Sequence, residues 1–253
     1  MVSPDILVGP RLKVERAYRH IDELIALTAP LSKTLYTIRQ EERGAMPDNT
    51  PVLWYELWYH PIKPIPETFA LIIGDVVHNF RCALDHLCTG ILRSKKPNAK
   101  GHFPMERNWT KFESLPVISE LEAALPGARK LLLCQIRPYG GQRERLWSFN
   151  QLNNDDKHNL LTPTVTIARI RGVNISSGNT HVGEMIVDTN AAESARMIHS
   201  DWPIKFDEDA EAIVQLSFGH AKVFENEPVV PTLKLIGDVV TETLNSFERL
   251  ILA

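Results

Sequence analysis

Two short segments of the chain carry most of the side chains that could do chemistry. Imidazoles exchange protons near neutral pH, carboxylates orient them, and a guanidinium binds phosphate or carboxylate groups through two parallel hydrogen bonds. A cluster of these residue types is therefore a candidate site. The candidate catalytic residues are His78, Arg81, Asp85 and His86 in the first segment and Asp156, Lys157 and His158 in the second.

The first segment lies in the most hydrophobic helical stretch of the chain, and its polar side chains fall on one face. At about 100° per residue, Asp85 projects about 20° from His78, and Arg81 about 60° from it. Asp75 lies about 60° away on the other side, and His86 about 80° away. Ionisable groups are costly to bury unless they are paired or used. The pattern therefore predicts a buried polar stripe, which either joins helices through hydrogen bonds or forms a site.

The second segment follows a predicted helix and precedes a predicted strand, which places it in a loop. Its charges either are solvated at the end of the helix or converge on the polar stripe, because loop residues on a rigid scaffold are common components of sites. A metal bound by His78 and Asp85 would need a third ligand from elsewhere, for which His158 or Asp156 is a candidate. No cofactor motif is present, and we predict no cofactor.

The position of these two segments depends on the helices and strands that the sequence predicts around them. Helical spacing runs from Arg11 to about Arg43, and Pro30 should kink or split that stretch. A long central helix is predicted over about 67–94. Further helices are predicted over 109–115, 118–125, 127–136, 142–153 and 230–252, and strands over 52–59, 164–173, 183–188 and 213–218, with a polar turn over 174–180.

This order of elements predicts an α+β protein. We expect a helical bundle around the long central helix, a β-rich C-terminal subdomain and a closing C-terminal helix. The predicted domains are a mainly helical one over 1–161 and a second over 162–253, whose last helix packs on the bundle.

The composition of the 253 residues narrows the classes of function. A net charge of −3 argues against a protein that binds nucleic acid through bulk electrostatic attraction. The three cysteines lack CxxC spacing, which predicts reduced thiols. Cys82 and Cys88 have no base adjacent in the sequence, so we expect them to pack as small hydrophobes rather than act as nucleophiles. The absence of a signal peptide and of a long uncharged apolar stretch predicts a soluble, cytoplasmic protein with no membrane partner.

The helix from Asp75 to Leu87 resembles a pattern found in uncharacterised bacterial and phage proteins. Those proteins carry a comparable HN-x-R-x-ALDHL helix and a later N-x-DKH segment, which residues 154–158 match. The resemblance covers roughly 66–161 and implies no particular activity.

A looser similarity is to HEPN domains, helical modules of many defence and toxin ribonucleases. Their hallmark is an arginine followed, after four to six residues, by a histidine in the same helix, and Arg81 and His86 fit it. In that family the motif helices of two protomers meet and form a metal-independent RNA-cleaving site. The resemblance therefore implies a homodimer and an RNA partner, with His86 handling protons and Arg81 stabilising the phosphate.

Three hypotheses remain open on the sequence. We favour a non-enzymatic binding or assembly module, with another protein or RNA as partner, in which the stripe holds helices together. The first alternative is an HEPN-like ribonuclease. The second is a metal-dependent hydrolase with His78, Asp85, His86 and His158 as ligands.

Overall fold

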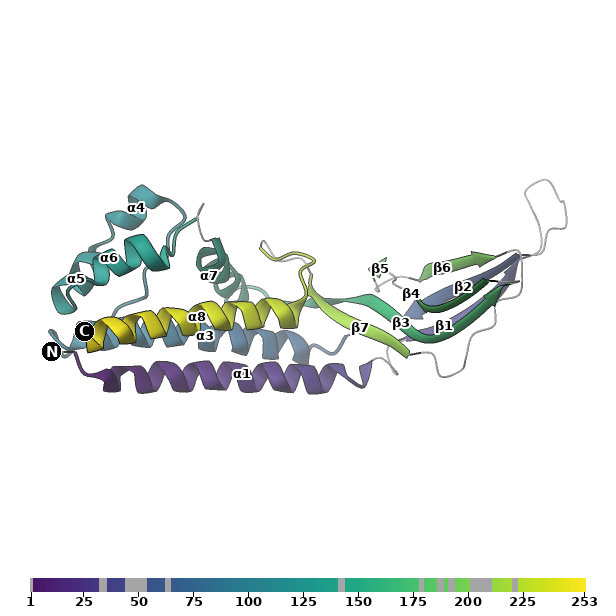
Figure 1. Ribbon diagram of the computed structural model, residues 1–253, viewed down its shortest axis with the longest axis horizontal. Coiled ribbons are helices and arrows are strands. Elements are labelled where there is room, and N and C mark those ends of the chain that lie inside the picture. Colours follow the sequence, from purple (N-terminus) through teal and green to yellow (C-terminus); the bar gives the residue numbers. More distant parts are fainter. Residues whose placement is uncertain are drawn as a thin grey trace. The chain divides into compact units, whose positions relative to one another are not determined.

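The protein divides into two compact units, described here from a computed structural model (Figure 1). The structure describes residues 2–31, 36–43, 54–61, 65–140, 144–177, 180–185, 189–190, 194–200, 211–219 and 223–253. Unit 1 comprises Met1–Leu24, Ala70–Leu161 and His220–Ala253, and unit 2 comprises Ile25–Phe69 and Thr162–Gly219. Both units are assembled from segments that are distant in the sequence.

Three long helices form the body of unit 1 and run alongside one another in Figure 1. They are α1 (Val8–Thr28), which continues a short 3-10 helix η1 (Pro4–Leu7), α3 (Thr68–Arg93) and α8 (Val229–Leu252).

The contacts between these helices fix their directions. Residues near the start of α1 lie beside residues late in α3, because a Cβ added at Gly90 would lie 3.1 Å from Cβ of Ile6. Arg11 donates to Glu248 of α8 at 2.8 Å, and Tyr18 donates to Asp238 at 3.1 Å. Helix α1 therefore runs antiparallel to both α3 and α8.

The interface of the three helices is apolar and closely packed. Phe80 of α3 is fully buried and meets the Tyr18 ring edge-on, with the ring centroids 5.7 Å apart. A glycine at 237 admits both rings, since an added Cβ would lie 2.6 Å from the Tyr18 hydroxyl and 2.7 Å from Cζ of Phe80. The buried aliphatic residues recur every three to four positions along each helix, as an amphipathic helix requires.

Shorter helices complete unit 1. A π-helical turn, η2, ends where the Arg137 N–H donates to the carbonyl of Leu132 at 2.9 Å and Arg137 adopts a left-handed conformation with φ of 54°. The side chain of Asn108 caps the first of the short helices. These elements are α4 (Trp109–Glu113), α5 (Pro116–Ala124), α6 (Ala128–Lys130), η2 (Leu131–Ile136) and α7 (Glu144–Asp156).

Unit 2 contains two small antiparallel sheets, with strand orders β1-β2-β6 and β4-β3-β5, and with β7 also paired to β3. On β2 the buried Glu56 faces β6, where its carboxylate accepts from Arg196 at 3.1 Å. The strands are β1 (Tyr36–Arg43), β2 (Trp54–Pro61), β3 (Pro163–Ser177), β4 (Thr180–Met185), β5 (Thr189–Asn190), β6 (Ala195–Ser200) and β7 (Glu211–Phe218).

The mixed helical and sheet character is confirmed, and so are the long helix predicted over 67–94 (α3) and the closing helix (α8). The helix predicted as far as Arg43 is wrong, because α1 ends at Thr28 and residues 36–43 form β1. The polar turn expected over 174–180 is also wrong in part, since β3 extends to Ser177. A separate C-terminal β-rich subdomain is not confirmed, because β1 and β2 belong to the same unit as β3 to β7.

Among the described residues, no helix is long and apolar enough to cross a membrane.

Candidate functional site

The polar stripe of α3 divides into buried and exposed parts. Asn79 is 8% exposed, and Arg81 and Asp85 are half-buried. His78 and His86 are exposed, so the prediction of a wholly buried stripe is wrong for them. The buried members are the ones held by other segments: Asn79 accepts from Lys13 of α1, and Arg81 and Asp85 bind the backbone of Phe103.

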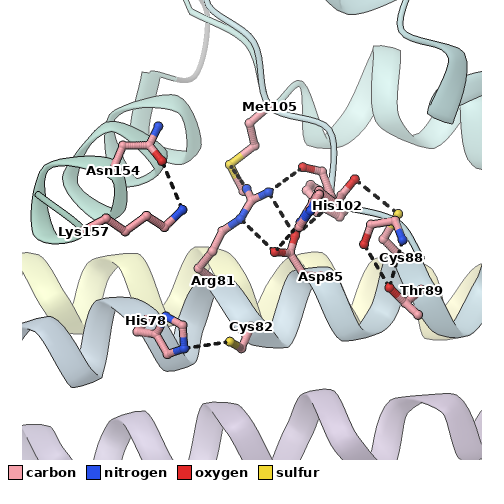
Figure 2. Close-up of polar contacts among 12 residues, drawn as sticks. His78, Arg81, Cys82, Asp85, Cys88, Thr89, His102, Met105, Asn154 and Lys157 are labelled. Atoms are coloured by element: carbon pink, nitrogen blue, oxygen red, sulfur yellow. Dashed lines mark hydrogen bonds and ion pairs between the residues drawn. The ribbon is translucent and has the colours of Figure 1, made fainter.

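Arg81 and Asp85 form an ion pair that connects α3 to the loop that follows it (Figure 2). The Arg81 guanidinium lies 3.0 Å from the Asp85 carboxylate and donates to the Phe103 carbonyl at 3.1 Å and to Sδ of Met105 at 3.1 Å. Asp85 also accepts from the Phe103 N–H at 2.8 Å and lies 3.1 Å from Nδ1 of His102. The side chains of Arg81 and Asp85 are only 12% and 22% exposed. Their contacts hold residues 102–105 against α3.

On its other edge the stripe is held by α1. The Asn79 amide donates to the Asp75 carbonyl at 2.8 Å and accepts from Nζ of Lys13 at 3.4 Å. Two turns further along α3, an added Cβ at Gly9 would lie 3.5 Å from Nδ1 of His86. Asn79 and Lys13 therefore fix the lateral position of α1 on α3.

The second candidate segment contacts α3 through Asp156. Its carboxylate lies on Gly74, where an added Cβ would be 3.0 Å from Cγ of Asp156. Burial raises the pKa of Asp156, the charge of Asp75 raises it further, and the charge of His78 lowers it. The structure therefore brings Asp156 to the exposed centre of the stripe.

The neighbours of Asp156 are placed differently. Lys157 is exposed and donates to Asn154 at 3.4 Å (Figure 2). His158 is exposed and makes no side-chain hydrogen bond or ion pair within the described part of the chain. Of Asp156 and His158, the structure thus joins only Asp156 to the stripe by a contact among the described residues, and the convergence of His158 stays a prediction.

Cys82 is a component of the site that the sequence interpretation missed. Its Sγ lies 3.3 Å from Nε2 of His78, one turn earlier on α3. Burial raises the pKa of this thiol, and Asp85 acts in the same direction, whereas Lys13, Arg81 and Lys157 lower it. The spacing of four residues could have revealed the pair, because residues i and i+4 of a helix lie on the same face.

A cavity of about 460 Å³ opens beside the later turns of α3. It lies entirely in unit 1, between the first turns of the chain and the loop at residues 100–102. His86 and Thr89 reach it from α3, and His86 makes no hydrogen bond with any described residue. The lining residues are Ile6, Gly9, Pro10, Asp85, His86, Thr89, Gly90, Arg93, Lys100, Gly101 and His102.

The cavity is basic. Asp85 is the sole carboxylate among its lining residues, and the Arg81 guanidinium already balances its charge. Arg93 donates through Nε to the Ala99 carbonyl at 3.0 Å, which leaves its two terminal nitrogens for other partners. Lys100 and His102 are exposed. This arrangement favours an anion.

The ligand set suggested for a metal-dependent hydrolase does not assemble. Within the described ranges, no three His, Cys, Asp or Glu side chains lie close enough together to hold a metal ion. His78, Asp85, His86 and His158 therefore do not form the expected centre.

No family model, curated protein or solved structure matches the chain.

Proposed function

We propose that unit 1 is a binding module whose ligand is a small anion held in the cavity next to His86. One observation carries this proposal: the cavity is lined by His86, Arg93, Lys100 and His102, and its sole carboxylate is already paired with Arg81. A site with this charge attracts a phosphate or carboxylate group, and Arg93 can bind it in a planar, directional way.

The buried part of the stripe supports a binding rather than a catalytic role. Arg81, Asp85 and Asn79 use their hydrogen bonds within the fold, where they hold residues 102–105 and α1 on α3. The exposed ring of His86 keeps its nitrogens for a ligand. The stripe thus both holds the helices together and supports one wall of the cavity.

The test is a calorimetric titration of the full chain with pyrophosphate at low ionic strength. We expect binding that weakens as salt is added, and a dissociation constant about tenfold higher in a His86→Ala/Lys100→Ala double variant. Lys234→Ala is the matched control, because Lys234 is an exposed lysine of α8 that does not line the cavity. Failure to bind at millimolar pyrophosphate, or an equal loss in the control, would contradict the proposal.

An HEPN-like ribonuclease is the second candidate, favoured by the exposure of His86 at a cavity that suits a phosphate. Arg81 is less suited to the role that the resemblance implies, because its guanidinium is engaged by Asp85, Phe103 and Met105. The measurement is RNA cleavage in EDTA by the wild type and by His86→Ala, with light scattering to detect a dimer. Cleavage that depends on His86 would favour this candidate over a simple binding module.

A further inference from the structure

A second chemical feature of α3 lies outside the cavity. Sγ of Cys82 is 3.3 Å from Nε2 of His78, within the range of a hydrogen bond from a thiol to an imidazole (Figure 2). Cys82 is half-buried and His78 is exposed, so a small reagent can reach the sulfur from the side of the imidazole. The proposed anion site does not use either residue.

Charged groups surround this pair on three elements. Asp156 of α7 rests on Gly74, close enough for the charge of His78 to affect the pKa of its carboxyl group. A carboxylate next to an imidazole stabilises the ring when it accepts a proton. The charged groups that act on Cys82 are Lys13 from α1, Arg81 and Asp85 from α3, and Lys157, which directly follows α7. Asp156, the last residue of α7, interacts with His78, and Asp75 of α3 acts on Asp156.

We propose that Cys82 and His78 form a nucleophile–base pair that reacts with small anionic disulfides to give a mixed disulfide on α3. Nε2 of His78 takes the proton of the thiol as Sγ attacks one sulfur of the disulfide. A new S–S bond forms, the original one breaks, and the leaving thiolate takes up the proton. Cys82 is oxidised and the incoming disulfide is reduced, so the step is balanced without another reagent.

The base matters because burial raises the pKa of the Cys82 thiol, so little thiolate is present near neutral pH. The preference for an anion follows from Lys13 and Lys157. Nζ of Lys13 lies 3.4 Å from Oδ1 of Asn79, three residues before Cys82 on α3, and the charges of both lysines act on the sulfur. The nearby carboxylate of Asp85 is paired with Arg81 at 3.0 Å.

The remaining cysteines provide internal comparisons. Cys88 is buried, donates to the His102 carbonyl at 3.4 Å and has a pKa raised to about 12 by burial. Cys134 is exposed and has no hydrogen bond to a histidine among the described residues. Only Cys82, of these three, combines access with a neighbouring base.

The experiment measures mixed-disulfide formation at each cysteine of the full chain by peptide mass spectrometry, with glutathione disulfide as the probe at pH 7.5. His78→Gln keeps a hydrogen-bonding side chain but cannot accept the proton. We expect it to slow the reaction at Cys82 at least about tenfold and to leave Cys134 unchanged. His158→Gln, which changes another exposed imidazole, should leave both rates unchanged.

A neutral probe separates the role of the base from that of the lysines. A Lys13→Gln/Lys157→Gln variant should slow the reaction with glutathione disulfide about threefold at low salt, and leave the reaction with 2-hydroxyethyl disulfide unaltered. The nucleophile–base pair is overturned if Cys82 in His78→Gln reacts within twofold of the wild type, or if Cys82 fails to react with either disulfide. The anion preference is overturned if the lysine variant slows both probes equally.

Discussion

The ion pair between Arg81 and Asp85 leads to a quantitative prediction of how Asp85→Asn changes the free energy of unfolding. This substitution keeps the shape of the side chain and an oxygen that can accept from the Phe103 N–H, but it removes the negative charge beside the guanidinium. Arg81 then keeps its full charge while its side chain is only 12% exposed. The substitution therefore isolates the cost of leaving a largely buried cation without its partner.

The expected cost lies between two limits. Breaking a fully buried ion pair costs about 3–5 kcal/mol, whereas exposed pairs contribute about 0–1 kcal/mol. Asp85 is 22% exposed, and Arg81 keeps the Phe103 carbonyl as an acceptor, so solvent and this carbonyl offset part of the loss. We expect the free energy of unfolding to fall by about 2 kcal/mol, which for a domain of this size lowers Tm by about 4–8 °C.

The assay is thermal unfolding followed by circular dichroism at 222 nm, with amide hydrogen exchange at Phe103 as a local readout. Glu242→Gln is the matched control, because it breaks the Arg249–Glu242 pair, whose side chains are both 64% exposed and whose atoms lie 2.7 Å apart. The control should leave Tm unchanged. The reasoning is refuted if Asp85→Asn has the same Tm as the Glu242→Gln control, or if hydrogen exchange at the Phe103 amide is no faster than in the wild type.

Three further substitutions, one of them with a glycine control, test packing and electrostatics. Gly237→Ala should lower the free energy of unfolding by about 1–3 kcal/mol in thermal melts, because its Cβ would overlap the buried Phe80 ring. Gly9→Ala is the control and should not destabilise the protein, because its Cβ would lie at an ordinary van der Waals distance from His86. Burial raises the pKa of Asp156, so its ionisation above that pKa costs stability; Asp156→Asn should raise Tm at pH 7, and the gain should vanish in acid, below the pKa of an unfolded aspartate. At Glu56 ionisation stabilises the fold, because hydrogen bonds to its carboxylate lower its pKa. Glu56→Gln should therefore lower Tm at pH 7. This difference from the wild type should disappear as the pH falls through the pKa of the folded carboxyl group.

The sequence predicts those parts of the fold whose local pattern and packing agree. Helix α3 has a proline before its start and apolar residues at helical spacing, and the structure places it within two residues of the predicted bounds. Strand β1 could not be predicted in this way, because its residues read equally well as an extension of α1. Its conformation is set by pairing with β2, in which Ile38 lies opposite Tyr59 and Gln40 opposite Leu57. Such pairing overrides local propensity.

In the candidate site too, local pattern predicts some features, and contacts between distant segments determine the rest. Helical spacing alone places His78, Arg81 and Asp85 on one side of α3. It cannot reveal that Arg81 binds a carbonyl of Phe103, because the path of the following loop depends on packing between distant segments. The contact of Asp156 with Gly74 depends in the same way on how α7 packs on α3.

The position of each side chain around α3 explains why one stripe has separate roles. Asn79 projects about 100° from His78, toward α1, and Arg81 projects about 60° from it in the other direction, toward the loop. Groups at these two edges satisfy their hydrogen bonds within the fold. Cys82, about 40° from His78, lies between the edges. Substitution at an edge should therefore change stability first, whereas substitution at the centre should change reactivity while the protein remains folded, and the melting and mass-spectrometry experiments separate these two effects.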